Sequence, residues 1–155
     1  MAKVRLVLGG LLALLLAASP CLAAEADSAV RTEIEQMLKA HGEAFDKKDL
    51  DVVMGFYAPE AVLMGTGPGE RYEGTEEIKE AHRHFFELFD KQTSVPTWHK
   101  FGIKGDVAWG LVMKHYTAYH KNMKNEYALN WSAAIEKQNG KWVFVSVHFS
   151  NLVCE

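Results

Sequence analysis

The chain has 155 residues, of which 48% are hydrophobic and 24% charged, and its formal net charge is -3. This length is enough for one domain and too short for two. The 2 cysteines exclude a disulfide scaffold, and the lack of a basic excess argues against nucleic acid as a partner, because phosphate binding requires a positive face.

The first 24 residues have the layout of a secretory signal peptide. Lys3 and Arg5 precede an uncharged run from Leu6 to Ala18. That run is about thirteen residues, shorter than the roughly 20 that span a bilayer, which argues against a permanent anchor. We expect an exported protein, periplasmic or extracellular, with no membrane association after cleavage. The mature domain is then residues 25–155, and its one cysteine, Cys154, is expected to be an exposed thiol.

The first half of the mature chain has the periodicity of helices. Apolar residues at i, i+3 and i+4 spacing predict helices over residues 28–45, 50–57 and 75–89. The second of these is expected to end before a proline. Between it and the third helix, residues 61–64 and 71–73 predict a short hairpin around a glycine-rich loop.

From residue 94 onward the hydrophobic period changes to two, which predicts strands. The expected strands are residues 94–103, 107–120, 126–137 and 142–149. Asn139-Gly140 is typical of a type I′ hairpin turn, because both central positions of that turn need a positive φ. The order of elements predicts an α+β domain with helices on one face of an antiparallel sheet.

Both faces of the predicted sheet are apolar. Strand 107–120 carries Val107, Trp109, Leu111 and Met113 on one face and Ala108, Gly110, Val112 and Tyr116 on the other; strand 142–149 carries Trp142 and Phe144 on one face and Val143, Val145, Val147 and Phe149 on the other. Helices can cover only one face, and in a sheet whose other face is exposed to solvent, polar and apolar residues alternate along each strand. We therefore expect a homodimer that buries the outer sheet face.

Four short motifs, taken in order, resemble those of one superfamily. They are Phe45 to Asp49, Phe56 to Val62, Tyr72 to Ile78 and Asn139 to Trp142, and together they resemble the nuclear transport factor 2-like superfamily and its SnoaL-like domains. The ending, Gly140 to Ser150, also resembles the association domain of calcium/calmodulin-dependent kinase. The resemblance covers essentially the whole mature chain.

The resemblance implies a cone-shaped curved antiparallel sheet wrapped around three N-terminal helices. It also implies a ligand-sized cavity between the sheet and the first helix, and pairing through the outer sheet face. It does not specify a function, because the superfamily contains isomerases, dehydratases, cyclases, hydrolases and non-catalytic binding or assembly domains.

Candidate catalytic residues are few. Ketosteroid isomerase and similar members place a carboxylate base in the loop after the short strand, where this chain has Gly65 to Gly69 with Glu70 as the nearest acid. This argues against steroid-type isomerase activity. His148 and Ser150 on the last strand are the candidate catalytic pair, on the expectation that they face the pocket. The alternative is a core histidine satisfied by one hydrogen bond.

Candidate ligand-binding residues are mostly aromatic. The expected cavity lining is Trp109, Tyr127, Trp131, Phe144, His41, His82 and Arg71. The aromatic side chains suit an apolar or planar ligand, and Arg71 at the cavity mouth suits an acidic group. Core and dimer packing is the alternative role for the aromatic residues, and solvation is the alternative for Arg71.

The seven histidines do not predict a metal site. His82 and His84 diverge around a helix, and His115 and His120 face opposite sides of a strand. We expect neither a metal nor another cofactor.

Three hypotheses for function follow. In the first, an exported SnoaL-like homodimer binds a small, mostly apolar molecule in its cone. In the second, the protein is an enzyme, a cyclase, isomerase or hydrolase, that uses a pocket histidine for proton transfer. In the third, it is a non-catalytic assembly domain.

Overall fold

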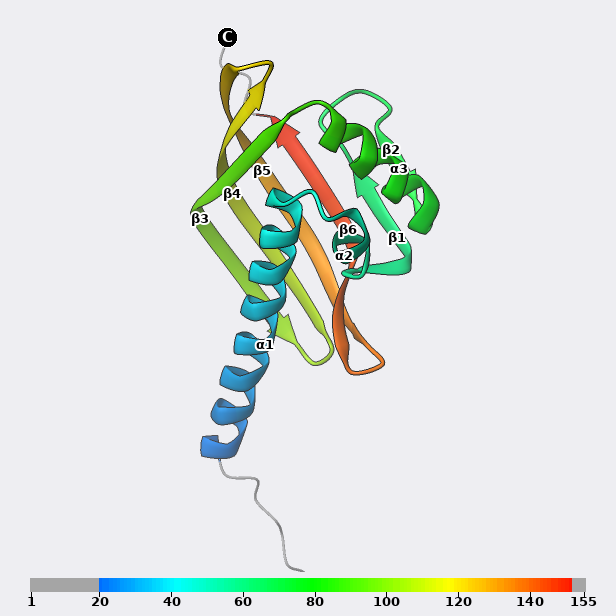
Figure 1. Cartoon of the computed structure of the whole chain (residues 1–155). Helices are drawn as coiled ribbons and strands as arrows, with labels where there is room; N and C mark the ends of the chain where they lie inside the picture. Colours follow the sequence, from blue (N-terminus) through cyan, green and yellow to red (C-terminus); the bar gives the residue numbers. More distant parts are fainter. Residues whose placement is uncertain (1–19, 152–155) are drawn as a thin grey trace, which may run out of the picture.

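The computed structural model describes residues 20–151. Its first half contains α1 (Pro20–Asp46), α2 (Leu50–Met54), β1 (Tyr57–Met64), β2 (Arg71–Glu73) and α3 (Gly74–Glu87). Its second half contains β3 (Lys91–Lys104), β4 (Val107–His120), β5 (Met123–Gln138) and β6 (Lys141–Asn151) (Figure 1). The predicted α+β class is confirmed, because helices pack against one sheet.

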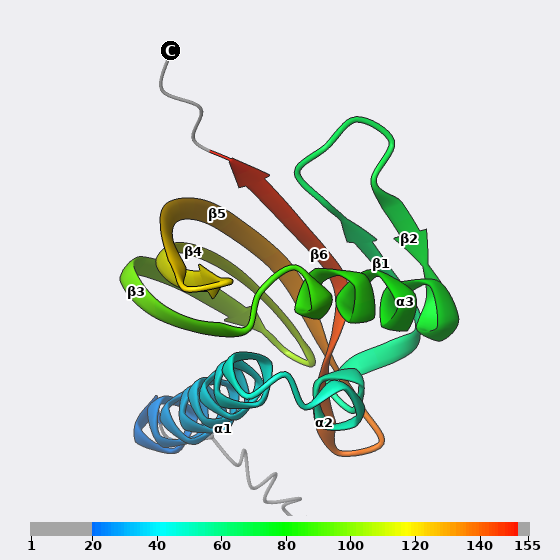
Figure 2. The ribbon, with the colours of Figure 1, turned by 45° about the horizontal axis from the view of Figure 1, so that its top comes forward.

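The six strands form one sheet in the order β2-β1-β6-β5-β4-β3. The sheet curves, and α1 and α3 lie on its concave side (Figure 2). Neighbouring strands are antiparallel except β1 and β6, which run parallel. The expectation of a purely antiparallel sheet is therefore wrong at this one pairing. Hydrophobic alternation carries no information about strand direction, and so it did not show the parallel pair.

The boundaries around α2 differ from the predicted ones. Helix α2 ends at Met54, and Tyr57 begins β1 instead of continuing the helical stripe. Pro59 lies inside β1, and the residue before a proline favours extended backbone. Helix α3 follows the β1–β2 hairpin, so only α1 and α2 precede the sheet in the described part of the chain.

Strand β6 contains a β-bulge. Ala134 of β5 pairs with Ser146, and the next residue, Ile135, pairs with Phe144, so Val145 is one extra residue in β6. The bulge reverses the alternation of side chains along the rest of the strand.

This bulge corrects the predicted faces of β6. Phe144 before it and Val147 after it are both buried in the core, with Phe149 packed against the same cluster. Strict alternation placed Phe144 opposite the other two, which is wrong. The outward positions after the bulge are the polar Ser146 and His148, and both are exposed.

The outer, convex face of the sheet is apolar over β3 and β4. Its exposed apolar residues, here called the outer strip, are Val95, Trp98, Val107, Trp109, Leu111 and Met113. The ring of Trp109 lies over Gly102, where an added Cβ would come within 2.7 Å of it. An apolar outer face is thus confirmed for β4, whereas Asn130 and Ser132 of β5 continue it as polar surface.

Candidate functional site

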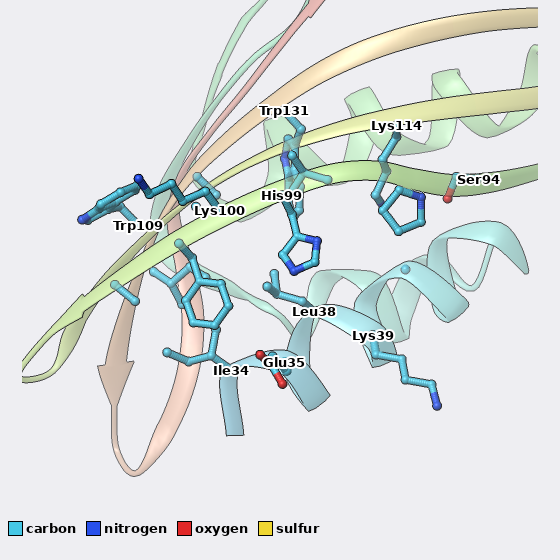
Figure 3. A pocket seen from close by; sticks show the side chains of 18 of the residues that line it. Ile34, Glu35, Leu38, Lys39, Ser94, His99, Lys100, Trp109, Lys114 and Trp131 are labelled. Carbon is cyan, nitrogen blue, oxygen red and sulfur yellow. The ribbon is translucent and has the colours of Figure 1, made fainter. Parts of the chain in front are cut away.

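The first cavity lies between α1 and strands β3 to β5 and has a volume of about 360 Å³. Figure 3 shows Ile34 and Leu38 projecting from α1 toward side chains of the sheet, among them Trp131. The apolar part of its lining consists mainly of Ile34, Leu38, Phe101, Val112, Ala133 and Ile135. Such a space, predominantly apolar and closed on one side by a helix, is typical of a small-molecule site.

One end of this cavity is polar. Asp46 in the last turn of α1 accepts two hydrogen bonds from Ser94 of β3, from its backbone N at 3.4 Å and its Oγ at 3.2 Å. Lys114 of β4 also lines this end, with its Nζ 5.4 Å from the centroid of the Trp131 ring. That distance is in the range of a cation–π interaction.

Burial acts on both charges at the polar end. It lowers the pKa of the Lys114 amine, and the nearby Asp46 carboxylate opposes that change. It also raises the pKa of the Asp46 carboxyl group, against the hydrogen bonds from Ser94 and the charge of Lys114. Each group therefore favours the ionised form of the other, while the surroundings disfavour both.

The remaining charged residues of the lining lie on exposed positions. They are Glu35, Lys39 and Glu43 on α1 and Lys100 on β3, with His99 beside them. Lys39 and Glu43 form an ion pair of 3.9 Å, whereas Lys100 pairs with Leu111 in the sheet and extends beside Trp109 (Figure 3).

His41 forms the centre of an aromatic cluster next to the cavity. It is 5% exposed and stacks on Trp131 with 6.0 Å between ring centroids. Phe144 meets it edge-on at 4.9 Å. Neither ring nitrogen of His41 has a hydrogen-bond partner among the described residues, and burial lowers its pKa to about 3. The predicted pocket histidine is thus a core residue that packs behind the cavity wall.

A second cavity of about 260 Å³ lies beside α3. His82 of α3 lines it, and the Nε2 atom of this buried ring is 3.0 Å from the Tyr57 hydroxyl. Burial lowers the pKa of His82 to about 4 and raises the pKa of Tyr57. At neutral pH the pair is therefore a neutral imidazole hydrogen-bonded to a neutral phenol.

Glu70 also lines the second cavity, but it is engaged in its own loop. Its Oε2 accepts a hydrogen bond of 2.8 Å from the backbone N of Gly67. Its side chain also occupies the space in which Gly65 would carry a Cβ. This carboxylate stabilises the loop that the sequence indicated as lacking a catalytic base.

His148 and Ser150 lie on the outer face of the sheet, away from both cavities. They pair across the strands with Ser132 and Asn130 and border an outer hollow of about 340 Å³ beside Trp98. The β6 bulge is the reason, because it directs these residues outward. The structure thus differs from the expectation that this pair faces the cone.

The other predicted lining residues are dispersed. Trp131 lines the first cavity, and Trp109 borders it from the outer strip. Phe144 is fully buried in the core. The Tyr127 hydroxyl donates to Gln92 Oε1 at 3.2 Å. Arg71 forms an ion pair of 3.2 Å with Glu73 on the exposed edge of β2.

Within residues 20–151 no group of three or more His, Cys, Asp or Glu side chains is arranged to hold a metal ion. None of the helices in that range is long and apolar enough to cross a membrane. Cys154 and most of the predicted signal peptide lie outside the described residues.

The polar end of the first cavity was not predicted. The signal was present in β4, where Lys114 interrupts the inward series Ala108, Gly110, Val112 and Tyr116. A single lysine on an otherwise apolar face of a strand indicates either a pocket or an ion pair. Asp46 gave no such signal, because it follows the helical stripe directly and resembles a helix end.

A helix-covered curved sheet with a cavity against its concave side defines a class of small α+β domains. The chain belongs to the SnoaL-like domain family, whose model matches residues 34–154. The family resemblance noted from the sequence is thereby confirmed. No curated protein matches the chain.

Solved structures share the fold at low sequence identity. A nuclear transport factor 2-like superfamily protein from Salmonella enterica has a TM-score of 0.74 and 21% identity, covering 83% of this chain and 94% of its own. A Xanthomonas campestris protein assigned as a calcium/calmodulin dependent protein kinase II association domain has a TM-score of 0.70 and 23% identity over 77% and 86% of the two chains. A protein from Novosphingobium aromaticivorans, assigned as a scytalone dehydratase, has a TM-score of 0.76 and 10% identity, covering 84% of this chain and 89% of its own. These similarities concern the fold alone.

Proposed function

We propose that this protein is an exported homodimer that binds a small, mostly apolar molecule in the first cavity. The observation that carries the proposal is the cavity itself: about 360 Å³ between α1 and the sheet, apolar for most of its wall and polar at one end. Pockets of this size and lining hold small ligands, with the few polar groups fixing the ligand's orientation.

The test is a ligand screen on the purified protein with a variant whose cavity is filled. Gly110 faces the cavity, and a Cβ there would make only an ordinary contact, 3.8 Å from Phe101. Gly110→Leu should abolish binding of any hit while the unfolding midpoint changes little. Thr117→Leu, on the outer face of the same strand, is the matched control and should bind normally. Hits that bind Gly110→Leu as well as the wild type would refute the proposal.

Export is supported by the charge and hydropathy pattern of the N-terminus. Cleavage near residue 24 would retain Ile34, Leu38 and His41, the α1 residues that line the cavity or pack behind it. Expression of the full chain in a Gram-negative host should give a periplasmic protein that has lost its first 23 to 26 residues, as measured by intact mass. A full-length cytoplasmic product would contradict export.

Dimerisation is supported by the outer strip. Trp98 and Trp109 are 47% and 48% exposed, which is unusual for tryptophan on the surface of a monomer. Burial of the outer strip by a second copy would remove this apolar surface from water.

A second candidate function is proton transfer in the second cavity. The hydrogen bond between His82 and Tyr57 favours it, since a positioned imidazole and phenol can relay a proton. His148 lies outside this cavity. A measured turnover that persists in His148→Ala and disappears in His82→Leu would therefore support this candidate. The converse pattern would exclude it.

A further inference from the structure

The polar end of the first cavity has hydrogen-bonding capacity that the protein leaves unused. Lys114 carries three donors, and the described residues provide it with neither a hydrogen bond nor an ion pair. Asp46 uses one position on each carboxylate oxygen for Ser94, which leaves one acceptor position on each. A donor and an acceptor therefore stand together at the end of an apolar cavity.

The charges at this end cancel. Lys114 and Asp46 contribute one positive and one negative charge, and each favours the ionised form of the other. A ligand anion placed here would gain Lys114 but meet Asp46, and a ligand cation would have the opposite conflict. The charges of Glu35, Lys39 and Glu43 at the mouth change this balance little, because they are exposed and screened by solvent.

We propose that Lys114 and Asp46 together recognise a neutral hydroxyl group on an otherwise apolar ring compound. A hydroxyl accepts and donates at once, so it can accept from Lys114 and donate to Asp46. No unpaired charge then remains in the cavity. The inference names the ligand class for the proposed binding function and rests on that function.

The apolar remainder of the ligand is set by the rest of the wall. Ile34, Leu38 and Phe101 contribute one side, and Val112, Ala133 and Ile135 contribute the other. The Trp131 indole lies under the Lys114 ammonium and offers a flat aromatic face next to the polar end. A volume of about 360 Å³ is at the small end of the range for ligand pockets. A compound with one ring, or with two fused rings, fits this description.

Three probes with the same ring system separate the alternatives. 2-Naphthol presents the hydroxyl, 2-naphthoate presents a carboxylate, and naphthalene presents neither, so their dissociation constants measured at about pH 7 compare the polar group alone. The wild-type protein should bind 2-naphthol about tenfold more tightly than either of the others. This first comparison needs no variant and does not depend on how a substitution folds.

Two variants then test the residues. Lys114→Met keeps the length of the side chain and should bind 2-naphthol no better than naphthalene. Asp46→Asn leaves Lys114 as an uncompensated positive charge, so this variant should switch its preference from 2-naphthol to 2-naphthoate. Lys141→Met, at an exposed position that lines none of the cavities, is the matched control and should keep the wild-type order. Thermal unfolding of each variant reports whether it is folded.

The outcomes distinguish the inference from the function on which it rests. Tighter binding of 2-naphthoate than of 2-naphthol by the wild type would overturn the inference. Equal binding of all three probes, unchanged in Lys114→Met, would overturn it and leave a purely apolar binding cavity. If none of the probes binds, and Gly110→Leu and wild type behave alike in a broader ligand screen, the proposed binding function itself fails.

Discussion

The two faces of the sheet differ in how the chain covers them. The concave face packs against α1 and α3, and its large side chains, such as Phe144 and Trp131, are almost completely buried. The convex face keeps Trp109 48% and Leu111 43% exposed, although these residues are as apolar as those inside. The same strand, β4, contributes to both faces. Apolar residues therefore make either face of a strand suitable for burial. The helices that cover the sheet determine which face is buried in the monomer.

Burial on the concave face stabilises the fold, and burial on the convex face would stabilise the proposed dimer. Removal of apolar area from water stabilises whichever contact removes it, by roughly 25 cal/mol per Å². On the concave side that contact exists in the monomer. On the convex side it requires a partner surface, and the first two predictions separate these cases.

The largest effect is expected for a tryptophan on the concave face. Trp131→Ala removes a buried indole that packs on His41 and Phe144, so it should lower the free energy of unfolding by about 3–5 kcal/mol. Trp98→Ala makes the same change at a side chain that is 47% exposed. Urea unfolding at low protein concentration should show a much smaller loss there. Equal losses would break the distinction between the faces.

The next effect concerns association through the convex face. Leu111→Glu places a charge in the middle of the outer strip and should weaken the proposed dimer by about a hundredfold in Kd, since a desolvated unpaired charge is costly. Val52→Glu on α2 is the control, because Val52 is also exposed, at 48%, but lies away from the sheet. Sedimentation velocity over a range of concentrations measures both. A wild-type protein that remains monomeric throughout would remove the association role of this face.

The contrast between the faces also shows how far the sequence determines the fold. Hydrophobic period, turn residues and helix stripes predicted every strand of the second half, since these are local properties. Asn139 and Gly140 both have the positive φ, 50° and 80°, that the predicted type I′ turn requires. Local patterns were thus sufficient for the elements and for the α+β class.

The faces after the bulge were not predictable in this way. A β-bulge leaves no clear mark on the sequence when, as at Val145, the extra residue is itself apolar and β-branched. That one residue decides that His148 faces outward and Val147 inward. The candidate catalytic pair depended on this alternation, and for that reason the sequence directed it to the wrong face.

The polar end of the cavity was partly predictable. Lys114 stands out on an apolar face, but its neighbour in space, Asp46, is 68 residues earlier in the sequence. Their proximity depends on how α1 crosses β3 and β4, which is a property of tertiary packing. Pairings of this kind require the three-dimensional structure.

A smaller effect tests the polar group inside the concave face. Burial holds the pKa of His41 at about 3, below its unfolded value, so the unfolded state binds a proton that the folded state does not. Stability should therefore fall as the pH drops below about 6.5. His41→Leu removes this contribution. The free energy of unfolding of the variant minus that of the wild type should therefore be about 2 kcal/mol more positive at pH 5 than at pH 7. His82, whose pKa is also lowered, continues to titrate in the variant.

Phe45→Leu provides the comparison for this experiment. Phe45 packs against His41 at 6.0 Å and does not titrate, so its replacement should change stability by the same amount at both pH values. Urea unfolding at the two pH values gives the four free energies. Parallel pH dependence in His41→Leu and wild type would show that His41 is not the residue that couples stability to pH.

The smallest expected effect concerns the turn that sets the register between β5 and β6, and with it which side chains reach each face. Gly140 has φ of 80°, a region that L-residues adopt at a cost. Gly140→Ala should therefore lower the free energy of unfolding by about 1 kcal/mol. Gly110→Ala, in the middle of β4, adds a Cβ in ordinary contact and should be neutral or slightly stabilising. If both substitutions have the same effect in urea unfolding, the turn does not control the pairing of β5 with β6, and the burial of the concave side chains must set that register instead.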